Sequence, residues 1–237
     1  MTFPVRAITL DLDDTLWPFA PIGARIERTL DAFLREHSPQ TAEMFPVEAM
    51  RRLRERVFAE NAHLIHDLSA LRQLTIEHAL RESGGDLALL DAAYEVFYAE
   101  RNRVEYYPDS LAALERIAAR VPVAAVTNGN ADLERVGIAH LFAFSLGSRE
   151  HGAAKPHASI FRAACDRLGC AHGDVLHVGD HIEADVAGAA RAGLRSCWIN
   201  REDRRWEHPE LAPDLEFDTL TALADWLDTV PTVADRT

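Results

Sequence analysis

The sequence is poor in cysteine and has no long hydrophobic run. Its three cysteines match neither the spacing of a metal site nor an even set of disulfides, so we expect small apolar residues in a reducing compartment. No apolar stretch approaches the roughly 20 residues that a membrane-spanning helix needs. The N-terminal segment also lacks the apolar region of a signal peptide. We therefore predict a cytoplasmic protein without a membrane partner.

Positive charge is scarce as well. The 237 residues include 25 lysines and arginines against 38 aspartates and glutamates, which gives a formal net charge of -13. Because proteins bind nucleic-acid backbones through clustered Lys and Arg, this balance argues against a nucleic-acid partner. It also means that an anionic substrate needs local positive charge or a metal ion at its site.

Lysine is nearly absent. Lys155 is the only one, and all other members of the lysine and arginine set are arginines. A lysine carries a compact point charge, whereas an arginine carries a planar fork of donors. The single lysine therefore suggests a site that needs a point charge, with a surface lysine retained by chance as the alternative.

The spacing of apolar residues separates two kinds of sequence. Residues 17–107 have apolar residues at helical spacing, whereas residues 1–16 and 108–237 alternate short β-branched runs with helices. Strands that alternate with helices predict a parallel sheet covered on both faces. We therefore predict an α/β fold with a Rossmann-like parallel sheet core and an inserted all-helical domain over residues 17–107.

The same patterns assign individual elements. After a first strand that ends at Asp11, strands are expected at residues 123–127, 144–146, 175–178, 196–199 and 215–217. Helices of the core are expected around residues 111–117, 157–168, 182–192 and 220–227. Helices of the insert are expected around residues 22–34, 50–58, 68–80 and 90–97.

Two carboxylates, Asp11 and Asp13, follow the first strand with one residue between them. Ligands of open α/β folds bind at the carboxyl ends of the strands. Close carboxylates repel each other there unless a cation or a proton lies between them. The pair therefore indicates a metal-assisted reactive site, and the alternative is an acidic turn, since Asp is common in turns.

Two other strand ends carry groups that suit a phosphate site. The segment 127–129, Thr-Asn-Gly, offers a hydroxyl and backbone N–H groups to an anion. Gly179 permits close backbone approach, Asp180 follows it, and Asp185 lies at the start of the next helix. Taken singly, the first segment is also an ordinary Asn-Gly turn, and Asp180 is also a helix N-cap.

Together, these motifs strongly resemble those of the haloacid dehalogenase superfamily of phosphohydrolases. The motifs occur in the superfamily's order, and they are Asp11-x-Asp13-x-Thr15, Thr127, Lys155, and Gly179-Asp180 with Asp185. The helical insert after the first motif looks like that superfamily's C1 cap, so the resemblance covers nearly the whole chain. It implies an enzyme, a phosphoric monoester hydrolase.

The resemblance also implies a role for each motif residue. Asp11 would be the nucleophile that forms an aspartyl-phosphate, and Asp13 would be the general acid and base. Thr127 and Lys155 would hold the phosphoryl oxygens.

A further implication is Mg²⁺ as the cofactor. Asp11, the backbone carbonyl of Asp13, and Asp180 would bind the ion. Asp185 would orient Lys155 or a metal-bound water. Positive charge is required because a carboxylate and a phosphate repel each other, by about 4 kcal/mol per unit-charge pair at ~4 Å and an effective dielectric constant of about 20.

Two alternative functions stay open at this stage. The first is hydrolysis of 2-haloacids by the same aspartate nucleophile. Halide leaves without protonation, and the dehalogenases that resemble this fold use no acidic residue at the Asp13 position, so Asp13 favours a phosphatase. The second is a noncatalytic phosphate-binding module, which Asp13 also disfavours because such a module could dispense with it.

The identity of the substrate is expected to depend on the insert. Segments 11–17, 127–130 and 177–180, with 197–199, look like those of bacterial flavin mononucleotide phosphatases. This likeness implies a small phosphorylated metabolite, flavin mononucleotide or 5-amino-6-(5-phosphoribitylamino)uracil. The candidate substrate-binding residues are Asn128, Gly129, Trp17, Arg101 and Arg103. Packing and surface charge are the alternative for the last three, and the sequence allows a monomer or a homodimer.

Overall fold

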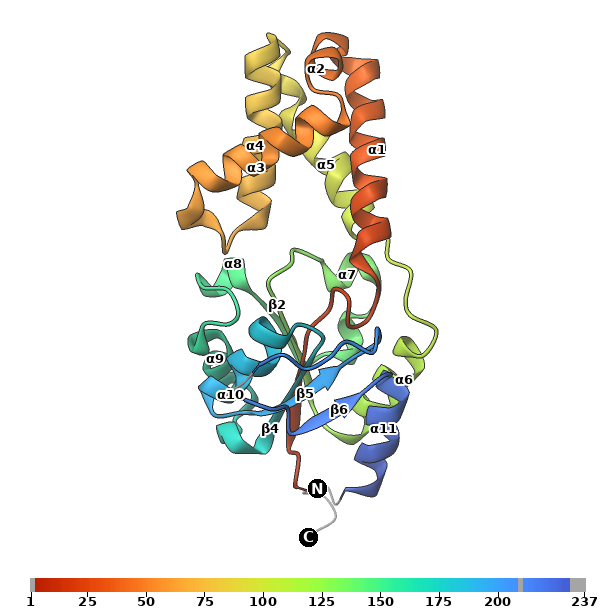
Figure 1. The fold of residues 1–237 in the computed structure, drawn as a ribbon. Coiled ribbons are helices and arrows are strands. Elements are labelled where there is room, and N and C mark those ends of the chain that lie inside the picture. The colour runs from red at the N-terminus through yellow and green to blue at the C-terminus, as the bar shows by residue number, and fades with distance from the viewer. Residues whose placement is uncertain (1–2, 209–210, 231–237) are drawn as a thin grey trace. The chain divides into compact units, whose positions relative to one another are not determined.

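The computed structural model describes residues 3–208 and 211–230 (Figure 1). Contacts between residues divide the chain into two units. The core unit comprises the described residues of Met1–Pro18, Glu105–Gly129 and Leu133–Thr237. The helical unit comprises Phe19–Val104 and the short segment Asn130–Asp132.

A six-stranded sheet organises the core unit, and every strand pair in it is parallel. The strands are β1 (Ala7–Leu10), β2 (Val123–Thr127), β3 (Phe144–Gly147), β4 (Val175–Gly179), β5 (Arg195–Ile199) and β6 (Leu215–Phe217). Their spatial order is β3-β2-β1-β4-β5-β6. This confirms the predicted Rossmann-like parallel sheet.

The central strands are buried along their whole length, which explains why they are nearly continuous apolar runs. All residues of β1, β2 and β4 are buried. The helices α6 (Ser110–Arg120) and α11 (Leu220–Thr229) pack together on one face of the sheet (Figure 1). The helices α9 (Ala158–Leu168) and α10 (Gly188–Ala192) cover the other face. Burial on both faces is the usual state of an all-parallel sheet.

Register places the reactive segments at one edge of this sheet. Leu10 at the end of β1 pairs with Ala125 of β2 and with Val178 of β4. The chain therefore leaves β1, β2 and β4 at the same carboxyl edge, which brings residues far apart in sequence together.

Short helices complete the core unit. They are α7 (Leu133–Val136), α8 (Ser148–His151), and the 3-10 turns η3 (Ala139–Leu141) and η4 (His172–Asp174). The helix expected over residues 182–192 is instead a π-helical turn, η5 (Ile182–Ala187), followed by α10. The wider turn accompanies the burial of Asp185, whose Oδ2 accepts a hydrogen bond from the His181 backbone N–H at 3.0 Å. Such turns are frequent at functional sites.

The helical unit contains the four expected helices. They are α1 (Phe19–His37), α3 (Val47–Glu60), α4 (Leu68–Ser83) and α5 (Leu90–Arg101). A further helix, α2 (Pro39–Met44), was not predicted because six residues are too short for a helical pattern. The unit also has two 3-10 turns, η1 (Ala62–Leu64) and η2 (Leu87–Leu89).

Apolar stripes and caps explain these helices. The buried face of α1 consists of Ile22, Ile26, Leu30 and Leu34, spaced four residues apart. Asp67 caps the start of α4, because its side chain accepts a hydrogen bond from the Ala70 N–H, and Gly84 caps its end in the left-handed conformation.

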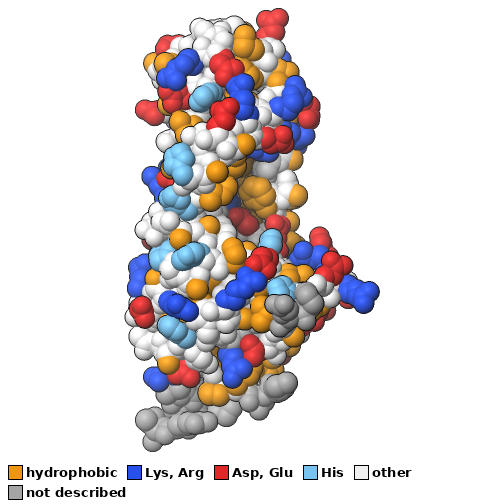
Figure 2. Space-filling view, turned by 60° about the vertical axis from the view of Figure 1, so that its left-hand side comes forward, with side chains coloured by type: hydrophobic (Ala, Val, Ile, Leu, Met, Phe, Trp, Pro, Cys, Tyr) orange, Lys and Arg blue, Asp and Glu red, His pale blue; other side chains and the backbone are white. Residues whose placement is uncertain are grey.

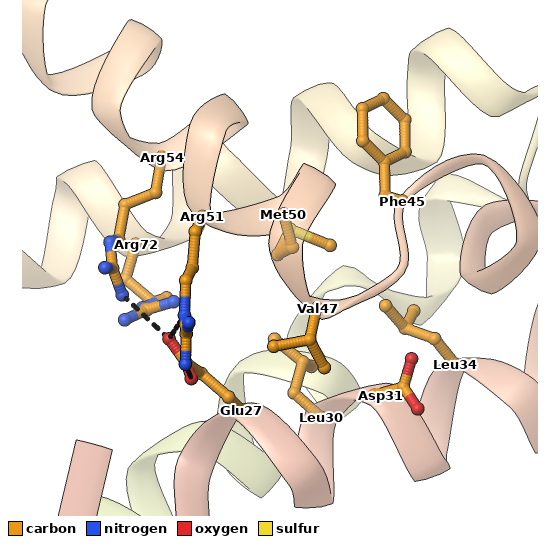
Figure 3. A pocket seen from close by; sticks show the side chains of 10 residues that line it. All are labelled: Glu27, Leu30, Asp31, Leu34, Phe45, Val47, Met50, Arg51, Arg54 and Arg72. Atoms are coloured by element: carbon orange, nitrogen blue, oxygen red, sulfur yellow. Dashed lines mark hydrogen bonds and ion pairs between the residues drawn. The ribbon is translucent and has the colours of Figure 1, made fainter. Parts of the chain in front are cut away.

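An ion pair joins α1 to α3 in the helical unit (Figure 3). Arg51 donates two hydrogen bonds to the Glu27 carboxylate, at 2.8 and 2.5 Å. The cavity beside this pair has a volume of only about 20 Å³. Such a space holds about one water molecule, so the cavity is not a metabolite site.

Charged side chains of both signs occur on the face of the protein that Figure 2 draws. On the face drawn in Figure 2, acidic and basic side chains are interspersed. Some charged side chains are paired within helices, as Arg35 is with Asp31 and Arg81 with Glu77. Within residues 3–208 and 211–230, no helix is both long and apolar enough to span a membrane.

Candidate active site

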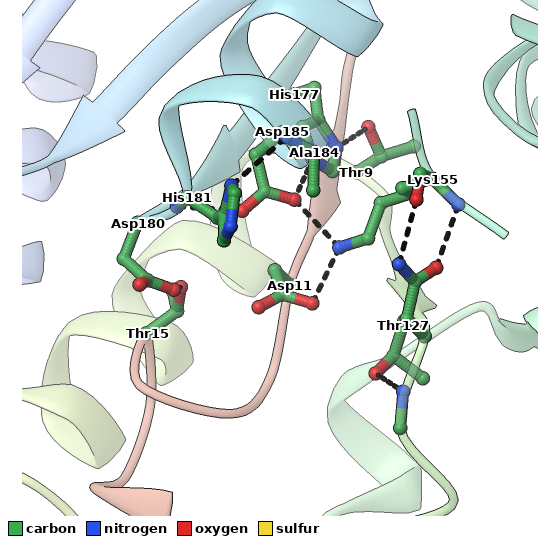
Figure 4. A network of polar contacts seen from close by, with 12 residues as sticks. Thr9, Asp11, Thr15, Thr127, Lys155, His177, Asp180, His181, Ala184 and Asp185 are labelled. Atoms are coloured by element: carbon green, nitrogen blue, oxygen red, sulfur yellow. Dashed lines mark hydrogen bonds and ion pairs between the residues drawn. The ribbon is translucent and has the colours of Figure 1, made fainter. Parts of the chain in front are cut away.

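Three charged side chains meet at the carboxyl edge of the sheet (Figure 4). The Lys155 ammonium donates hydrogen bonds to Oδ1 of Asp11 at 2.5 Å and to Oδ1 of Asp185 at 2.7 Å. The residues are 5%, 8% and 1% exposed, respectively, so the lysine is a buried cation shared by two carboxylates. A buried charge is tolerated only where it is paired in this way. The sequence-predicted Asp11, Lys155 and Asp185 are thus brought together.

Burial and neighbouring charges shift the ionisation of all three groups. Burial, together with the nearby Asp185 and Asp180, holds the pKa of Asp11 well above its usual range, although Lys155 opposes the shift. Burial disfavours the charge of Lys155, but Asp11 and Asp185 outweigh it and raise the pKa of the ammonium group. Despite burial, Lys155 and His177 hold the pKa of Asp185 below its usual range. The charged forms of Lys155 and Asp185 are therefore both favoured, and these two residues form an ion pair. The charged form of Asp11 is disfavoured.

Asp180 completes an acidic cluster beside the lysine. Oxygen atoms of Asp11, Asp180 and Asp185 all lie within 4.8 Å of one another. Burial, followed by the charges of Asp185 and Asp14, raises the pKa of Asp180 to about 7. A set of close carboxylate oxygens fits a hard divalent cation such as Mg²⁺, because the ion prefers oxygen ligands and relieves the repulsion.

Asp13 lines one cavity together with the three carboxylates of this cluster. Its Oδ1 accepts a hydrogen bond from Nε1 of Trp17 at 2.8 Å. The cavity has a volume of about 160 Å³. It is lined by Asp11, Asp13, Asp14, Thr127, Asn128, Gly129, Lys155, Asp180, His181, Ala184 and Asp185. The core unit thus gathers the predicted catalytic residues around one cavity.

The loop after β2 holds the lysine in place. The Asn128 side-chain amide donates to the Lys155 carbonyl at 2.8 Å and accepts from the Lys155 N–H at 2.7 Å. Thr127 Oγ1 accepts a hydrogen bond from the Gly129 N–H at 2.9 Å. Both ends of the Asn128 amide are thus occupied by the Lys155 backbone, and substrate contacts by Asn128 and Gly129 stay predictions.

A buried polar pair behind Asp185 was missed by sequence reasoning. His177 contacts Asp185 Oδ1 through Nε2 at 3.1 Å and Thr9 Oγ1 through Nδ1 at 2.9 Å. Burial lowers the pKa of His177, which favours the neutral ring. Because Asp185 accepts, the proton is assigned to Nε2, and Thr9 then donates to Nδ1. The available signal was a histidine inside a fully buried strand.

Three candidate substrate-binding residues are not among the residues that line this cavity. Trp17 is fully buried in the core unit, and its contact with substrate stays a prediction. Arg101 belongs to the helical unit, is 2% exposed, and donates a hydrogen bond to Asn130 at 3.0 Å. Arg103, also in the helical unit, forms an ion pair with Glu100 at 3.2 Å. Contacts of the two arginines with substrate stay predictions.

The parallel sheet, with the buried Asp-Lys-Asp cluster at its carboxyl edge, places the protein among enzymes with a Rossmann-like α/β core. The chain belongs to the haloacid dehalogenase-like hydrolase family, whose model matches residues 5–193.

Known relatives agree with this assignment. The 5-amino-6-(5-phospho-D-ribitylamino)uracil phosphatase YigB of Escherichia coli is 34% identical, over 92% of this chain and 94% of its own length. The phosphoserine phosphatase of Thermus thermophilus is 32% identical, over 91% of this chain and 96% of its own length. With such relatives, the protein is a phosphomonoester hydrolase of this family.

A solved structure of a protein described as a 2-haloacid dehalogenase is also similar. It comes from Pseudomonas syringae pv. tomato, is 36% identical, and superposes with a TM-score of 0.88 over 94% of this chain and 98% of that one. The likeness agrees with the fold, and it makes haloacid hydrolysis an activity to be tested directly.

Proposed function

We propose that the protein hydrolyses flavin mononucleotide or 5-amino-6-(5-phosphoribitylamino)uracil through an aspartyl-phosphate on Asp11. The observation that carries the chemistry is Lys155, buried between Asp11 and Asp185 at the edge of a cavity that Asp13 also lines. The choice of substrate is supported by the likeness to the E. coli phosphatase, which spans nearly both chains.

The first chemical step is transfer of the phosphoryl group to the protein. A carboxylate oxygen of Asp11 forms a bond to phosphorus while the ester P–O bond breaks. Asp13 gives its proton to the departing alkoxide oxygen. Lys155 stabilises the negative charge on the phosphoryl oxygens, and Asp185 keeps the ammonium directed at the site.

The second step regenerates Asp11. Asp13, now a carboxylate, takes a proton from a water molecule whose oxygen attacks phosphorus. The bond between Asp11 and phosphorus breaks, and inorganic phosphate leaves. Asp11, Asp180 and the Asp13 carbonyl would hold Mg²⁺, which when bound supplies positive charge that lets a carboxylate approach a phosphate dianion.

A substrate panel with and without metal tests this function. Flavin mononucleotide, the ribityl phosphate, sugar phosphates and nucleotides are assayed by phosphate release, with Mg²⁺ or with EDTA. We expect Mg²⁺-dependent turnover with a preference for one of the two riboflavin-related compounds. A flat profile across the panel contradicts the substrate proposal but not the phosphatase chemistry.

A matched pair of variants tests the nucleophile. Asp11→Asn is expected to abolish hydrolysis of p-nitrophenyl phosphate, whereas Asp166→Asn, at an exposed position of α9, keeps wild-type activity. Substantial turnover by Asp11→Asn would remove Asp11 from its proposed role.

Chloroacetate separates the phosphatase from the dehalogenase. Because Asp13 is suited to protonate an alkoxide and halide needs no proton, we expect no chloride release. Chloride release without metal, and no phosphate release from any ester, would favour the dehalogenase. The cytoplasmic location and the absence of nucleic-acid and membrane partners stay predictions from the sequence.

A further inference from the structure

Trp17 is placed to control the carboxyl group of Asp13. The tryptophan is fully buried in the core unit, and its Nε1 donates a hydrogen bond to Asp13 Oδ1 at 2.8 Å. The backbone closes around the same contact, since the Asp14 N–H donates to the Trp17 carbonyl at 2.7 Å. Asp14 has a φ of 60°, which lets the chain turn back sharply between Asp13 and Trp17.

The indole ring is itself held from a second segment of the core unit. Tyr106 packs edge-on against Trp17, with ring centroids 5.7 Å apart and an interplanar angle of 73°. The Tyr107 N–H donates to the Leu16 carbonyl at 3.0 Å, which fixes the backbone next to Trp17. Arg201 donates to the Thr15 carbonyl at 3.0 Å. The indole N–H is therefore directed at Asp13 by packing and by backbone hydrogen bonds.

An indole can donate a hydrogen bond but cannot accept one. Trp17 can therefore bind Asp13 Oδ1 when the carboxyl group is ionised. It can also bind Oδ1 when the group is protonated, provided that the proton is on Oδ2. A free carboxyl group would distribute its proton over both oxygens and over several orientations. The hydrogen bond restricts both.

We propose that Trp17 is a positioning residue, whose indole N–H directs the transferable proton of Asp13 to Oδ2 and toward the leaving oxygen. This inference rests on the proposed function, because it requires Asp13 to be the general acid. It is a different role from the substrate contact that the sequence suggested for Trp17, which stays a prediction.

The leaving group provides the test. A general acid matters most when the departing oxygen is a strong base and matters little when it leaves as a stable anion. A series of substituted phenyl phosphates, from phenyl to p-nitrophenyl phosphate, varies this property at nearly constant shape. The quantity measured is kcat/KM for each ester, which reports the steps up to departure of the phenol.

Trp17→Phe keeps an aromatic ring and removes the N–H donor. We expect kcat/KM to fall about tenfold for phenyl phosphate and less than about twofold for p-nitrophenyl phosphate. The plot of log kcat/KM against the basicity of the leaving group thus becomes steeper. Trp226→Phe in α11, whose ring packs against Phe217, is the matched control and keeps the wild-type slope.

A second variant is used if Trp17→Phe does not fold, as judged by circular dichroism. Benzothienylalanine incorporated at position 17 keeps the shape of the indole and replaces its N–H by sulfur. The same steepening is expected. A common fall in kcat/KM for every ester, or no change, overturns the positioning role.

Asp13→Asn separates the inference from the function on which it depends. If Asp13→Asn steepens the plot and the Trp17 variants do not, Asp13 is the acid and the inference about Trp17 is wrong. If Asp13→Asn leaves the slope unchanged, the proposed role of Asp13 fails and the inference about Trp17 fails with it. Combining Trp17→Phe with Asp13→Asn should add no further change in slope, because Trp17 acts through Asp13.

Discussion

The Nζ atom of Lys155 lies 2.5 Å from Oδ1 of Asp11, in a site where their side chains are 2% and 11% exposed. The lysine is thus the cation beside the proposed nucleophile, and it opposes the rise in the pKa of Asp11 that burial causes. We therefore expect Lys155 to affect both the rate of hydrolysis and the stability of the substrate-free site.

Lys155→Met is therefore expected to lower kcat/KM for p-nitrophenyl phosphate by on the order of 10³. It also leaves two buried carboxylates without their cation, at a cost of about 3 to 5 kcal/mol in the free energy of unfolding. Because protonation relieves this repulsion, the loss should be larger at pH 8 than at pH 5.5, as measured by urea unfolding. Equal losses at both pH values would show that the carboxylates do not depend on Lys155.

Gly179 lies against Asp185 so closely that a side chain does not fit. A Cβ atom at this position would lie 2.3 Å from Cγ of Asp185 and 2.4 Å from its Oδ2. The carboxylate cannot move aside freely, because it is bonded to Lys155, His177 and the His181 N–H. We expect Gly179→Ala to lower both kcat/KM, at least about tenfold, and stability, by about 1 to 3 kcal/mol.

Gly173 offers the matched control, because a Cβ added there meets nothing within 4 Å. Gly173→Ala should keep activity and stability near the wild-type values. Steady-state kinetics and thermal unfolding of the two variants side by side measure the effect. Wild-type activity in Gly179→Ala would show that Asp185 tolerates displacement.

Much of the fold follows from local sequence patterns. Strand β2 at Val123–Thr127 was predicted because the apolar run Val-Ala-Ala-Val ends in Thr127, which an Asn-Gly turn follows. The parallel arrangement followed from the alternation of strands and helices. The short α2 and the π-helical turn at Ile182–Ala187 were not predictable, since neither has a periodic pattern long enough to recognise.

The site was predictable only as far as strand ends can be recognised. Asp11 and Asp180 follow apolar runs, so their meeting at one sheet edge could be expected. The contact between Thr9 and His177 could not, because these residues become neighbours only when β1 pairs with β4, 168 residues further along the chain. The burial of Trp17 likewise depends on Tyr106, which reaches it from the other end of the helical insert.

Asp180 predicts a pH dependence of metal binding. Burial and the nearby carboxylates raise its pKa to about 7, so the group binds a proton more tightly than an ordinary aspartate. A metal ion must displace that proton, and its apparent affinity therefore falls as the pH decreases through 7. Between pH 8 and pH 6 the apparent affinity for Mg²⁺ should fall about tenfold, measured by calorimetric titration at constant ionic strength.

Arg204 provides an internal check on this prediction. Its Nη2 lies 3.8 Å from Oδ2 of Asp180 and favours the ionised carboxylate. Arg204→Gln should therefore raise the pKa of Asp180 further and move the loss of Mg²⁺ affinity to higher pH. An affinity that is constant from pH 6 to pH 8 would contradict the shifted pKa.

Asp109 predicts a different pH dependence, that of folding. Arg201 donates to both of its carboxylate oxygens, at 2.8 and 3.3 Å, and the Leu220 N–H at the start of α11 donates at 2.7 Å. Partial burial alone would raise the pKa of Asp109, but these hydrogen bonds outweigh it and lower the pKa. A carboxyl group with a lowered pKa in the folded state stabilises the protein above the unfolded-state pKa of about 4, and this stabilisation is lost as the pH falls further.

Asp109→Asn should accordingly lower the free energy of unfolding by about 2 kcal/mol at pH 7. It removes the carboxylate that pairs with Arg201, and the half-buried guanidinium is then without that counter-charge. The difference from the wild type should shrink below pH 4, where Asp109 of the wild type also becomes protonated. Urea unfolding at pH 7, 5 and 3.5 measures both quantities, and Asp166→Asn, at an exposed position, controls for the loss of one surface charge. If the difference between Asp109→Asn and the wild type is the same at all three pH values, the carboxylate of Asp109 contributes no charge-dependent stability and its pairing with Arg201 is structural only.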